Sequence, residues 1–145
     1  MNKNFWKNKK VFITGHTGFK GSWLIMILLK MGAKVKGLSL PLNKENYLFG
    51  KIEESILNEI IHLEGNILDK EYLDKEIKNF EPDFVFHLAA QSLVRKSYHE
   101  PLLTWETNLF GSLNLLNSFK NYQKKCSIII VTTDKVYKNK EWEFG

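Results

Sequence analysis

Three glycines near the start of the chain are spaced to bind a phosphate group. Gly15, Gly18 and Gly21 follow a run of β-branched and aromatic residues at 11–14 and precede an apolar segment with helical periodicity. Gly15 permits a sharp exit from a strand, Gly18 admits a pyrophosphate without a Cβ in the way, and Gly21 lets a helix pack closely. The free N–H groups at the start of that helix would then face the phosphates. This G-x-x-G-x-x-G motif therefore predicts dinucleotide binding, in preference to a purely structural turn.

The elements around this turn alternate between predicted strands and helices. Gly32 ends the first helix, as glycine commonly does just past a helix C-terminus. The helix at 19–31 carries an apolar stripe of Phe19, Trp23, Leu24, Ile27, Leu28 and Met31, and the helix at 101–122 carries one of Leu102, Trp105, Leu109, Leu113, Leu116 and Phe119. Strands are expected at 11–14, 33–40, 60–64, 83–88 and 127–132, a further helix at 69–80, a loop with one short helix at 42–58, and a loop at 89–99.

This alternation predicts one α/β domain over residues 1–145. We expect a Rossmann-like, doubly wound parallel sheet in three α/β/α layers, truncated after strand five, with strand order 3-2-1-4-5. A ligand of such a sheet lies at the carboxyl ends of strands one and four. The glycine turn, residues 89–91 and residues 132–135 all fall on that edge, so they are the candidate site.

Composition narrows the class of protein. The formal net charge is +5, but Arg95 is the only arginine and most lysines are interleaved with acids, which disfavours nucleic-acid recognition. The lone Cys126 excludes a disulfide framework and a cysteine metal cluster, and it indicates a reducing, cytoplasmic environment. We expect Cys126 to be a small packing residue and His87 to be a hydrogen-bonded core residue, and the sequence shows no partner pattern for His62 or His99. No metal site and no membrane-spanning or signal segment is expected.

Four segments resemble the extended short-chain dehydrogenase/reductase superfamily. They read VFITGHTGFKGSWL, FHLAAQSLVRKSY, TNLFGSLNLL and VTTDKVYKNKEWEFG. Within that superfamily they look most like the N-terminal part of the CDP-glucose 4,6-dehydratase family, on the evidence of Lys20 in the turn, Gln91 after an Ala-Ala pair, and Thr133-Asp134-Lys135. The resemblance implies a lyase that acts on a nucleotide sugar and uses NAD as an internal hydride carrier. It implies cofactor contacts from Gly15, His16, Thr17, Gly18, Phe19, Lys20, Gly21, Ser39, Asn66, Ile67, Leu88, Ala89, Ala90, Gln91, Asn108 and Thr132.

The same resemblance implies three catalytic residues. Thr133 would hydrogen-bond the C4 oxygen of the sugar, Asp134 would protonate the departing C6 hydroxyl, and Lys135 would be the base at C5. Without the surrounding motifs, Asp134 and Lys135 would be read as a solvated turn after a strand. For Asn108 the resemblance implies support of the active site, and a surface amide on a helix is the alternative.

The chain departs from the family pattern in two places. Ser39 stands where an acid normally binds the adenosine ribose, and Asn66 stands where many relatives carry Asp. The Tyr-x-x-x-Lys pair expected after strand five is missing; Tyr47 and Lys51 have that spacing but precede strand three, which we interpret as coincidence. We therefore expect this chain to bind NAD and to have little turnover alone. The alternatives are a non-catalytic dinucleotide-binding or interaction module that associates through the exposed edge of strand five, and another extended-family epimerase or reductase. A homo-oligomer is compatible with each of these readings.

Overall fold

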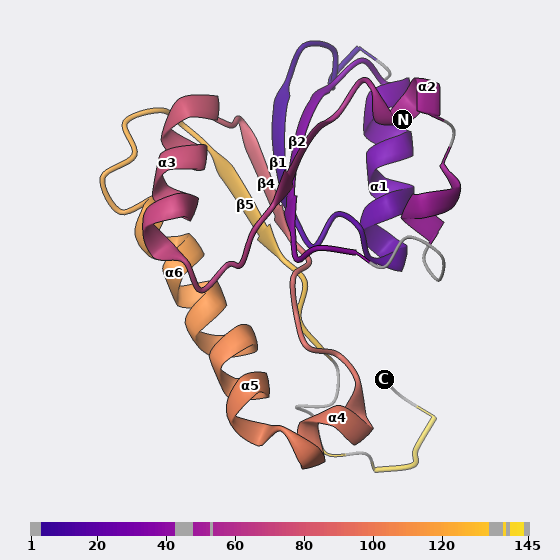
Figure 1. Cartoon of the computed structure of the whole chain (residues 1–145), viewed down its shortest axis with the longest axis vertical. Helices are drawn as coiled ribbons and strands as arrows, with labels where there is room; N and C mark the ends of the chain where they lie inside the picture. The colour runs from indigo at the N-terminus through magenta and orange to yellow at the C-terminus, as the bar shows by residue number, and fades with distance from the viewer. Residues whose placement is uncertain (1–3, 43–47, 53, 134–137, 139, 144–145) are drawn as a thin grey trace.

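The computed structural model describes residues 4–42, 48–52, 54–133, 138 and 140–143. Its centre is a five-stranded, fully parallel sheet with the order β3-β2-β1-β4-β5, which confirms the predicted topology (Figure 1). Both β3 and β5 are edge strands. The strands are β1 (Lys10–Thr14), β2 (Lys34–Ser39), β3 (Ile61–Glu64), β4 (Phe84–His87) and β5 (Ser127–Ile130).

Helices cover both faces of the sheet and give it three layers. On one face lies α1 (Phe19–Lys30), with η2 (Leu48–Lys51) and α2 (Glu54–Leu57) beside it; on the other lie α3 (Lys70–Phe80) and α6 (Gly111–Ser118) (Figure 1). Alternate residues of the central strands point to opposite faces, so each face has its own apolar core. The α1 side is built on Val11, Ile13 and Val35, and the α3 side is built on Phe12, Leu38 and Val85.

Helix α3 forms where its sequence predicts it. The Asp69 side chain accepts a hydrogen bond from the N–H of Tyr72 at 3.0 Å, which satisfies one of the free donors at the helix start. Leu73, Ile77 and Phe80 then recur at helical spacing and are all buried. The helix ends at Glu81, whose backbone is left-handed with a φ of 51°.

The loop predicted at 89–99 contains a helix. Residues Val94–His99 form α4, one and a half turns that bury none of their side chains. A helix of this length without a buried face leaves no apolar period in the sequence, so pattern analysis could not find it. It ends before Glu100, because the residue before Pro101 is disfavoured in a helical conformation.

The long helix predicted at 101–122 is interrupted, and it buries a different face from the one predicted. It consists of α5 (Pro101–Trp105), a π-helical turn η3 (Glu106–Phe110) and α6, and its last helical residue is Ser118. The residues that α6 buries are Gly111 and Leu115, whereas most of the predicted stripe is exposed. Periodicity locates an apolar stripe but does not say which neighbour it meets, and a π-turn shifts the helix face further. The exposed stripe residues are Leu102, Trp105, Leu109, Leu113 and Leu116.

Helix α1 shows the same kind of correction. Phe19, Trp23 and Ile27 of the predicted stripe are exposed. The buried face of the helix consists of Gly21, Ser22, Ile25, Leu28 and Leu29, so Leu28 is the member of the predicted stripe that is buried as expected. Within the described part of the chain, no helix is both long and apolar enough to cross a membrane.

Candidate functional site

The glycine turn after β1 is tightly enclosed by its neighbours. Gly15 has a φ of +72°, and a Cβ on it would lie 2.7 Å from the backbone nitrogen of Ala89. Its N–H donates to the carbonyl of Leu38 at 2.8 Å, and its own carbonyl accepts the N–H of Gly18 at 3.2 Å. The turn is therefore held against the ends of both β2 and β4, and only glycine fits at position 15.

Gly21 allows the first turn of α1 to approach the glycine turn itself. A Cβ on Gly21 would lie 2.4 Å from the carbonyl oxygen of Gly15, so the close packing predicted for this residue is against the turn. No side chain caps the helix, and the N–H groups of Phe19, Lys20 and Gly21 have no acceptor within the described residues. These donors, at the positive end of a 12-residue helix, suit the diphosphate of a dinucleotide.

The two side chains that follow Gly15 both point inward. The hydroxyl of Thr17 donates to the hydroxyl of Ser39 at 2.8 Å, and both residues are buried. The imidazole of His16 is fully buried against Gly37 and Phe49, so it is not presented to a ligand at the edge. These contacts hold the turn onto β2.

His62 has a partner that no sequence pattern indicated. Its Nδ1 lies 2.6 Å from Nε2 of His16, across the gap between β3 and the turn. Burial, followed by the proximity of His62, lowers the pKa of His16 from 6.5 to about 4, so this ring is neutral at physiological pH. The pairing joins residues 46 positions apart, and it follows from strand register rather than from a local motif.

A chain of hydrogen bonds, which begins in the buried core and ends at the surface, joins β1 and β4 to η3. Nδ1 of His87 lies 2.6 Å from the hydroxyl of Thr14, which accepts the N–H of Ala89 at 3.3 Å. Nε2 of His87 lies 2.9 Å from the hydroxyl of Ser112, which donates to the carbonyl of Asn108 at 2.8 Å. When the Ser112 hydroxyl donates to that carbonyl, a neutral His87 donates from Nε2 and accepts at Nδ1. His87 is thus a satisfied core residue, as predicted.

Residues 89–91 are held in place by Asn108 and by Gln91 itself. The Asn108 carboxamide accepts the N–H of Gln91 at 2.7 Å and donates to its carbonyl at 3.1 Å. The Gln91 side chain donates to the hydroxyl of Thr104 at 3.0 Å and accepts the N–H of Leu93 at 2.8 Å. Asn108 is exposed on its helix, and its carboxamide supports the loop after β4. Sequence reasoning missed Thr104 and Ser112, which carry no recognisable motif.

The remaining predicted residues lie around the same edge. Asn66 is exposed, with its side-chain oxygen accepting the N–H of Leu68 at 3.0 Å, and Ile67 is buried against Gly111. Leu88 and Ala89 are half-buried, and Ala90, Thr132 and Thr133 are exposed. Asp134, Lys135 and Tyr47 lie outside the described residues.

Cys126 has the character of a packing residue. It is half-buried beside β5, and burial raises the pKa of its thiol to about 11. A thiol with this pKa is protonated at neutral pH and is a poor nucleophile.

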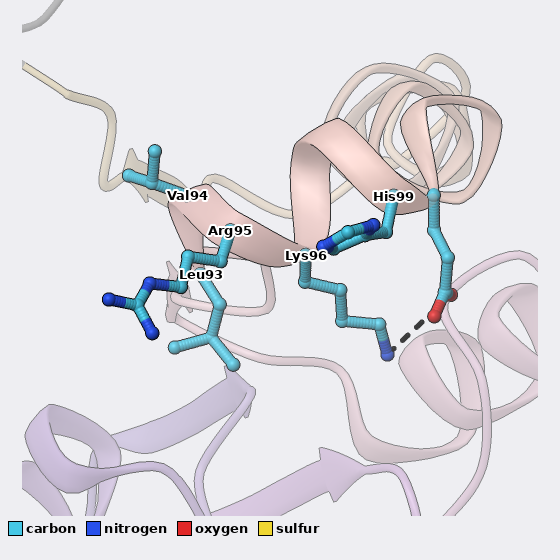
Figure 2. A pocket seen from close by; sticks show the side chains of 6 residues that line it. Leu93, Val94, Arg95, Lys96 and His99 are labelled. Carbon is cyan, nitrogen blue, oxygen red and sulfur yellow. Dashed lines mark ion pairs between the residues drawn. The ribbon is translucent and has the colours of Figure 1, made fainter.

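Two shallow hollows lie beyond the carboxyl ends of the strands. One, of about 290 Å³, is lined by Thr104, Trp105, Asn108 and Leu109. The other, of about 500 Å³, lies on α4: it carries Arg95, Lys96 and His99 beside Leu93 and Val94, with Lys96 paired to Glu100 at 3.7 Å (Figure 2). Arg95 points away from Lys96 and His99 in Figure 2.

The sequence of the chain is similar to those of enzymes that act on nucleotide sugars. A family model described as GDP-mannose 4,6 dehydratase matches residues 12–142. The CDP-glucose 4,6-dehydratase of Salmonella typhimurium is 46% identical over 145 residues, which are 100% of this chain and 40% of that protein. The identity covers the whole chain, as the resemblance of the four segments predicted.

Solved structures give the same fold. The UDP-glucose 4-epimerase of Thermus thermophilus, in complex with NAD, matches with a TM-score of 0.65 and 32% identity over 78% of this chain and 34% of that one. The UDP-glucose 4-epimerase of Thermotoga maritima, with UDP-glucose, matches with a TM-score of 0.71 and 29% identity over 83% of this chain and 37% of that one. The chain thus spans well under half the length of these relatives.

Proposed function

The chain belongs to the family described as GDP-mannose 4,6 dehydratase, and we propose that it forms the NAD-binding part of a CDP-glucose 4,6-dehydratase. The main support for the proposal is that the glycine turn, residues 89–91 and Asn108 lie together at the carboxyl edge of the sheet. Identity of 46% to a CDP-glucose 4,6-dehydratase supports this nucleotide sugar over others. Residues 1–145 would act as one cofactor domain.

The residues of the glycine turn fit the diphosphate of NAD. The N–H groups of Phe19, Lys20 and Gly21 point from the start of α1, and the pro-Cβ position of Gly18 has Gly15 O as its nearest neighbour at 3.3 Å. That side of Gly18 is otherwise open, so a phosphate oxygen can approach the backbone. The hydroxyls of Thr17 and Ser39 hold the turn in this shape. NAD in the neighbouring epimerase structure agrees with this choice of cofactor.

The chemistry would be completed by residues after β5. NAD, when bound, would supply a reversible hydride acceptor between C4 and C6 of the sugar. Thr133 would hydrogen-bond the C4 oxygen, Lys135 would remove the C5 proton, and Asp134 would give a proton to the C6 hydroxyl as water leaves.

Lys135 can be a base only if its pKa falls far below the ordinary value. Burial near a positively charged nicotinamide is an environment that would lower a lysine pKa in this direction. An epimerase needs no acid for a C6 hydroxyl, so Asp134 favours the dehydratase over the epimerases that are also among the relatives.

The cofactor proposal is tested by titrating the ¹⁵N-labelled chain with NAD. We expect the amides of residues 16–21 and 89–91 to shift together and to saturate. The Gly18→Ala variant should weaken binding by about tenfold or more, because its methyl group occupies the open side of the turn. The Gly50→Ala variant, at an exposed glycine of η2, is the matched control and should bind as the wild type does. Amides that do not move in folded protein would refute NAD binding.

Activity is tested separately. We propose that the chain alone does not convert CDP-glucose, since the general acid–base groups of an enzyme typically contribute about 10²–10⁴-fold each and the Tyr-x-x-x-Lys pair is missing. Incubation with NAD and CDP-glucose, followed by chromatography, should show no 4-keto-6-deoxy product. Steady product formation would contradict this part of the proposal only.

A further inference from the structure

The serine at the end of β2 is not placed to bind a ribose. Ser39 is 6% exposed, and its hydroxyl lies 2.8 Å from that of Thr17 and 3.4 Å from the Thr17 nitrogen. It therefore holds the glycine turn instead of facing the open edge. The acid that dinucleotide-binding sheets normally carry at this position has no counterpart on β2 among the described residues.

An acid stands beside Ser39 on the neighbouring strand. Glu64 is the last residue of β3 and pairs with Ser39 in the parallel register. Paired residues of parallel strands point to the same face, so Glu64 lies on the face that carries Ser39 and α1. The hydrogen bond from the N–H of Gly65 to the carbonyl of Ser39, at 2.8 Å, holds the end of β3 there.

Side-chain contacts agree with this placement. Oε1 of Glu64 lies 3.8 Å from Nε2 of His62, and Nδ1 of the same imidazole contacts His16 of the glycine turn. The carboxylate is thus on the turn side of the sheet. The Glu64 side chain is 55% exposed, so it is open to a ligand.

The other polar side chains after β3 already have local roles. Asn66 accepts the N–H of Leu68, and Asp69 accepts the N–H of Tyr72 at the start of α3. The side-chain oxygens of Asn66 and Asp69 thus accept backbone N–H groups, whereas no hydrogen bond from a backbone group to the Glu64 carboxylate is found among the described residues. Its nearest recorded partner is His62, at a distance longer than a hydrogen bond.

We infer that Glu64, and not a residue of β2, accepts hydrogen bonds from the adenosine ribose hydroxyls of the bound dinucleotide. This inference rests on the proposed NAD site. A carboxylate offers two acceptor oxygens to the two hydroxyls of a ribose, and hydrogen bonds to a charged group are stronger than neutral ones. The same negative charge repels a 2′-phosphate. Glu64 therefore both binds NAD and discriminates against NADP.

The test compares NAD with 2′-deoxy-NAD on the wild type and on Glu64→Gln, by calorimetry. Loss of a hydrogen bond to a charged group costs about 1.5–3 kcal/mol, so NAD affinity should fall roughly 10–100-fold in the variant. The variant should change 2′-deoxy-NAD affinity much less, because one hydroxyl that Glu64 binds is already absent. Equal losses for the two ligands, or no loss for either, would overturn the inference.

NADP gives a second, independent readout. The wild type should prefer NAD over NADP by at least about tenfold, from the charge repulsion expected of a nearby carboxylate. Glu64→Gln should narrow that preference, and Glu64→Asp should keep most of it. The control is Glu59→Gln, at an exposed acid before the opposite end of β3, which should bind all three ligands as the wild type does. An unchanged NAD/NADP ratio in Glu64→Gln would contradict the assignment.

The two proposals fail in different ways. If the wild type binds no NAD, the proposed cofactor site and the role of Glu64 are both wrong. If it binds NAD and Glu64→Gln shows no selective loss, the cofactor site stands and only the role of Glu64 is wrong. Unfolding midpoints of the variants should match the wild type, since the Glu64 side chain is more than half exposed.

Discussion

The carboxamide of Asn108 makes two hydrogen bonds with the backbone of Gln91, one at each side of the residue. It accepts from the nitrogen at 2.7 Å and donates to the carbonyl oxygen at 3.1 Å. This pairing imitates one rung of a sheet, and it connects the π-helical turn to the loop at the end of β4. The position of the loop therefore depends on a residue 17 positions away.

Replacing Asn108 should release this loop with little effect on the rest of the fold. In Asn108→Ala we expect the Gln91 amide to exchange its hydrogen roughly 2–10-fold faster, since its hydrogen bond contributes about 0.5–1.5 kcal/mol. NAD affinity should fall as well. Hydrogen exchange by NMR measures the first effect. Asn117→Ala, at an exposed asparagine of α6, is the control, and unchanged protection at Gln91 would contradict the role of Asn108.

Two glycines with similar backbone angles should tolerate alanine very differently. Gly15 has a φ of +72° and no room for a Cβ, whereas Gly32 has a φ of +80° and ordinary contacts, the nearest at 3.6 Å. Gly32→Ala should cost about 1–2 kcal/mol of unfolding free energy, the penalty for a left-handed alanine. Gly15→Ala adds a backbone clash and should cost more than about 3 kcal/mol. Urea unfolding of both variants measures the difference, and similar losses would exclude the clash with Ala89.

Burial of His16 should make the protein less stable in acid. Its pKa is about 4 in the folded chain and 6.5 in the reference state, so the unfolded chain binds the extra proton first. The part of the unfolding free energy that depends on a neutral His16 is fully present above pH 6.5, and it is lost as the pH falls toward 4. At pH 4.5 it amounts to a loss of about 2.5 kcal/mol.

Urea unfolding at pH 7 and pH 4.5 tests this for the wild type, His16→Gln and the exposed-residue control His99→Gln. The pH dependence should shrink only in His16→Gln. An equal dependence in all three proteins would show that His16 titrates normally.

The direction of the His87 hydrogen bonds predicts a single neutral tautomer. Nε2 should carry the proton and Nδ1 should not, because the Ser112 hydroxyl is already a donor to Asn108. Burial lowers the pKa of His87, so this form should persist below pH 6.5. Long-range ¹H–¹⁵N spectra distinguish the two nitrogens directly. A proton on Nδ1 would mean that the Thr14–His87–Ser112 chain runs in the other sense.

Neighbouring leucines of α6 should differ sharply in their contribution to stability. Leu115 is fully buried, and Leu116 is 44% exposed. Truncating a buried leucine to alanine typically costs about 2–5 kcal/mol, whereas an exposed one costs far less. Thermal unfolding of Leu115→Ala and Leu116→Ala should show the large loss only in the first. A larger loss in Leu116→Ala would instead support the apolar stripe predicted from the sequence, which contains Leu116.

The strand order and the helix boundaries near caps were predictable, because each depends on local chemistry. The glycine turn, the Asp69 cap and the alternation of strands with helices are all written in short segments. The partners of His16, the burial of Ser39 and the buried face of α6 were not predictable. They depend on strand register and on a π-turn, which bring together residues that are distant in sequence.

The close packing of the glycine turn against its neighbours also affects the rate and the affinity of ligand binding. Hydrogen bonds join the N–H of Gly15 to the carbonyl of Leu38 and the N–H of Gly18 to the carbonyl of Gly15. A third joins the hydroxyls of Thr17 and Ser39. The N–H groups at the start of α1 are therefore already oriented before a dinucleotide binds. A preorganised site loses little conformational entropy on binding, and the encounter needs no slow rearrangement of this segment. Variation in affinity among turn variants should therefore appear mainly in the dissociation rate.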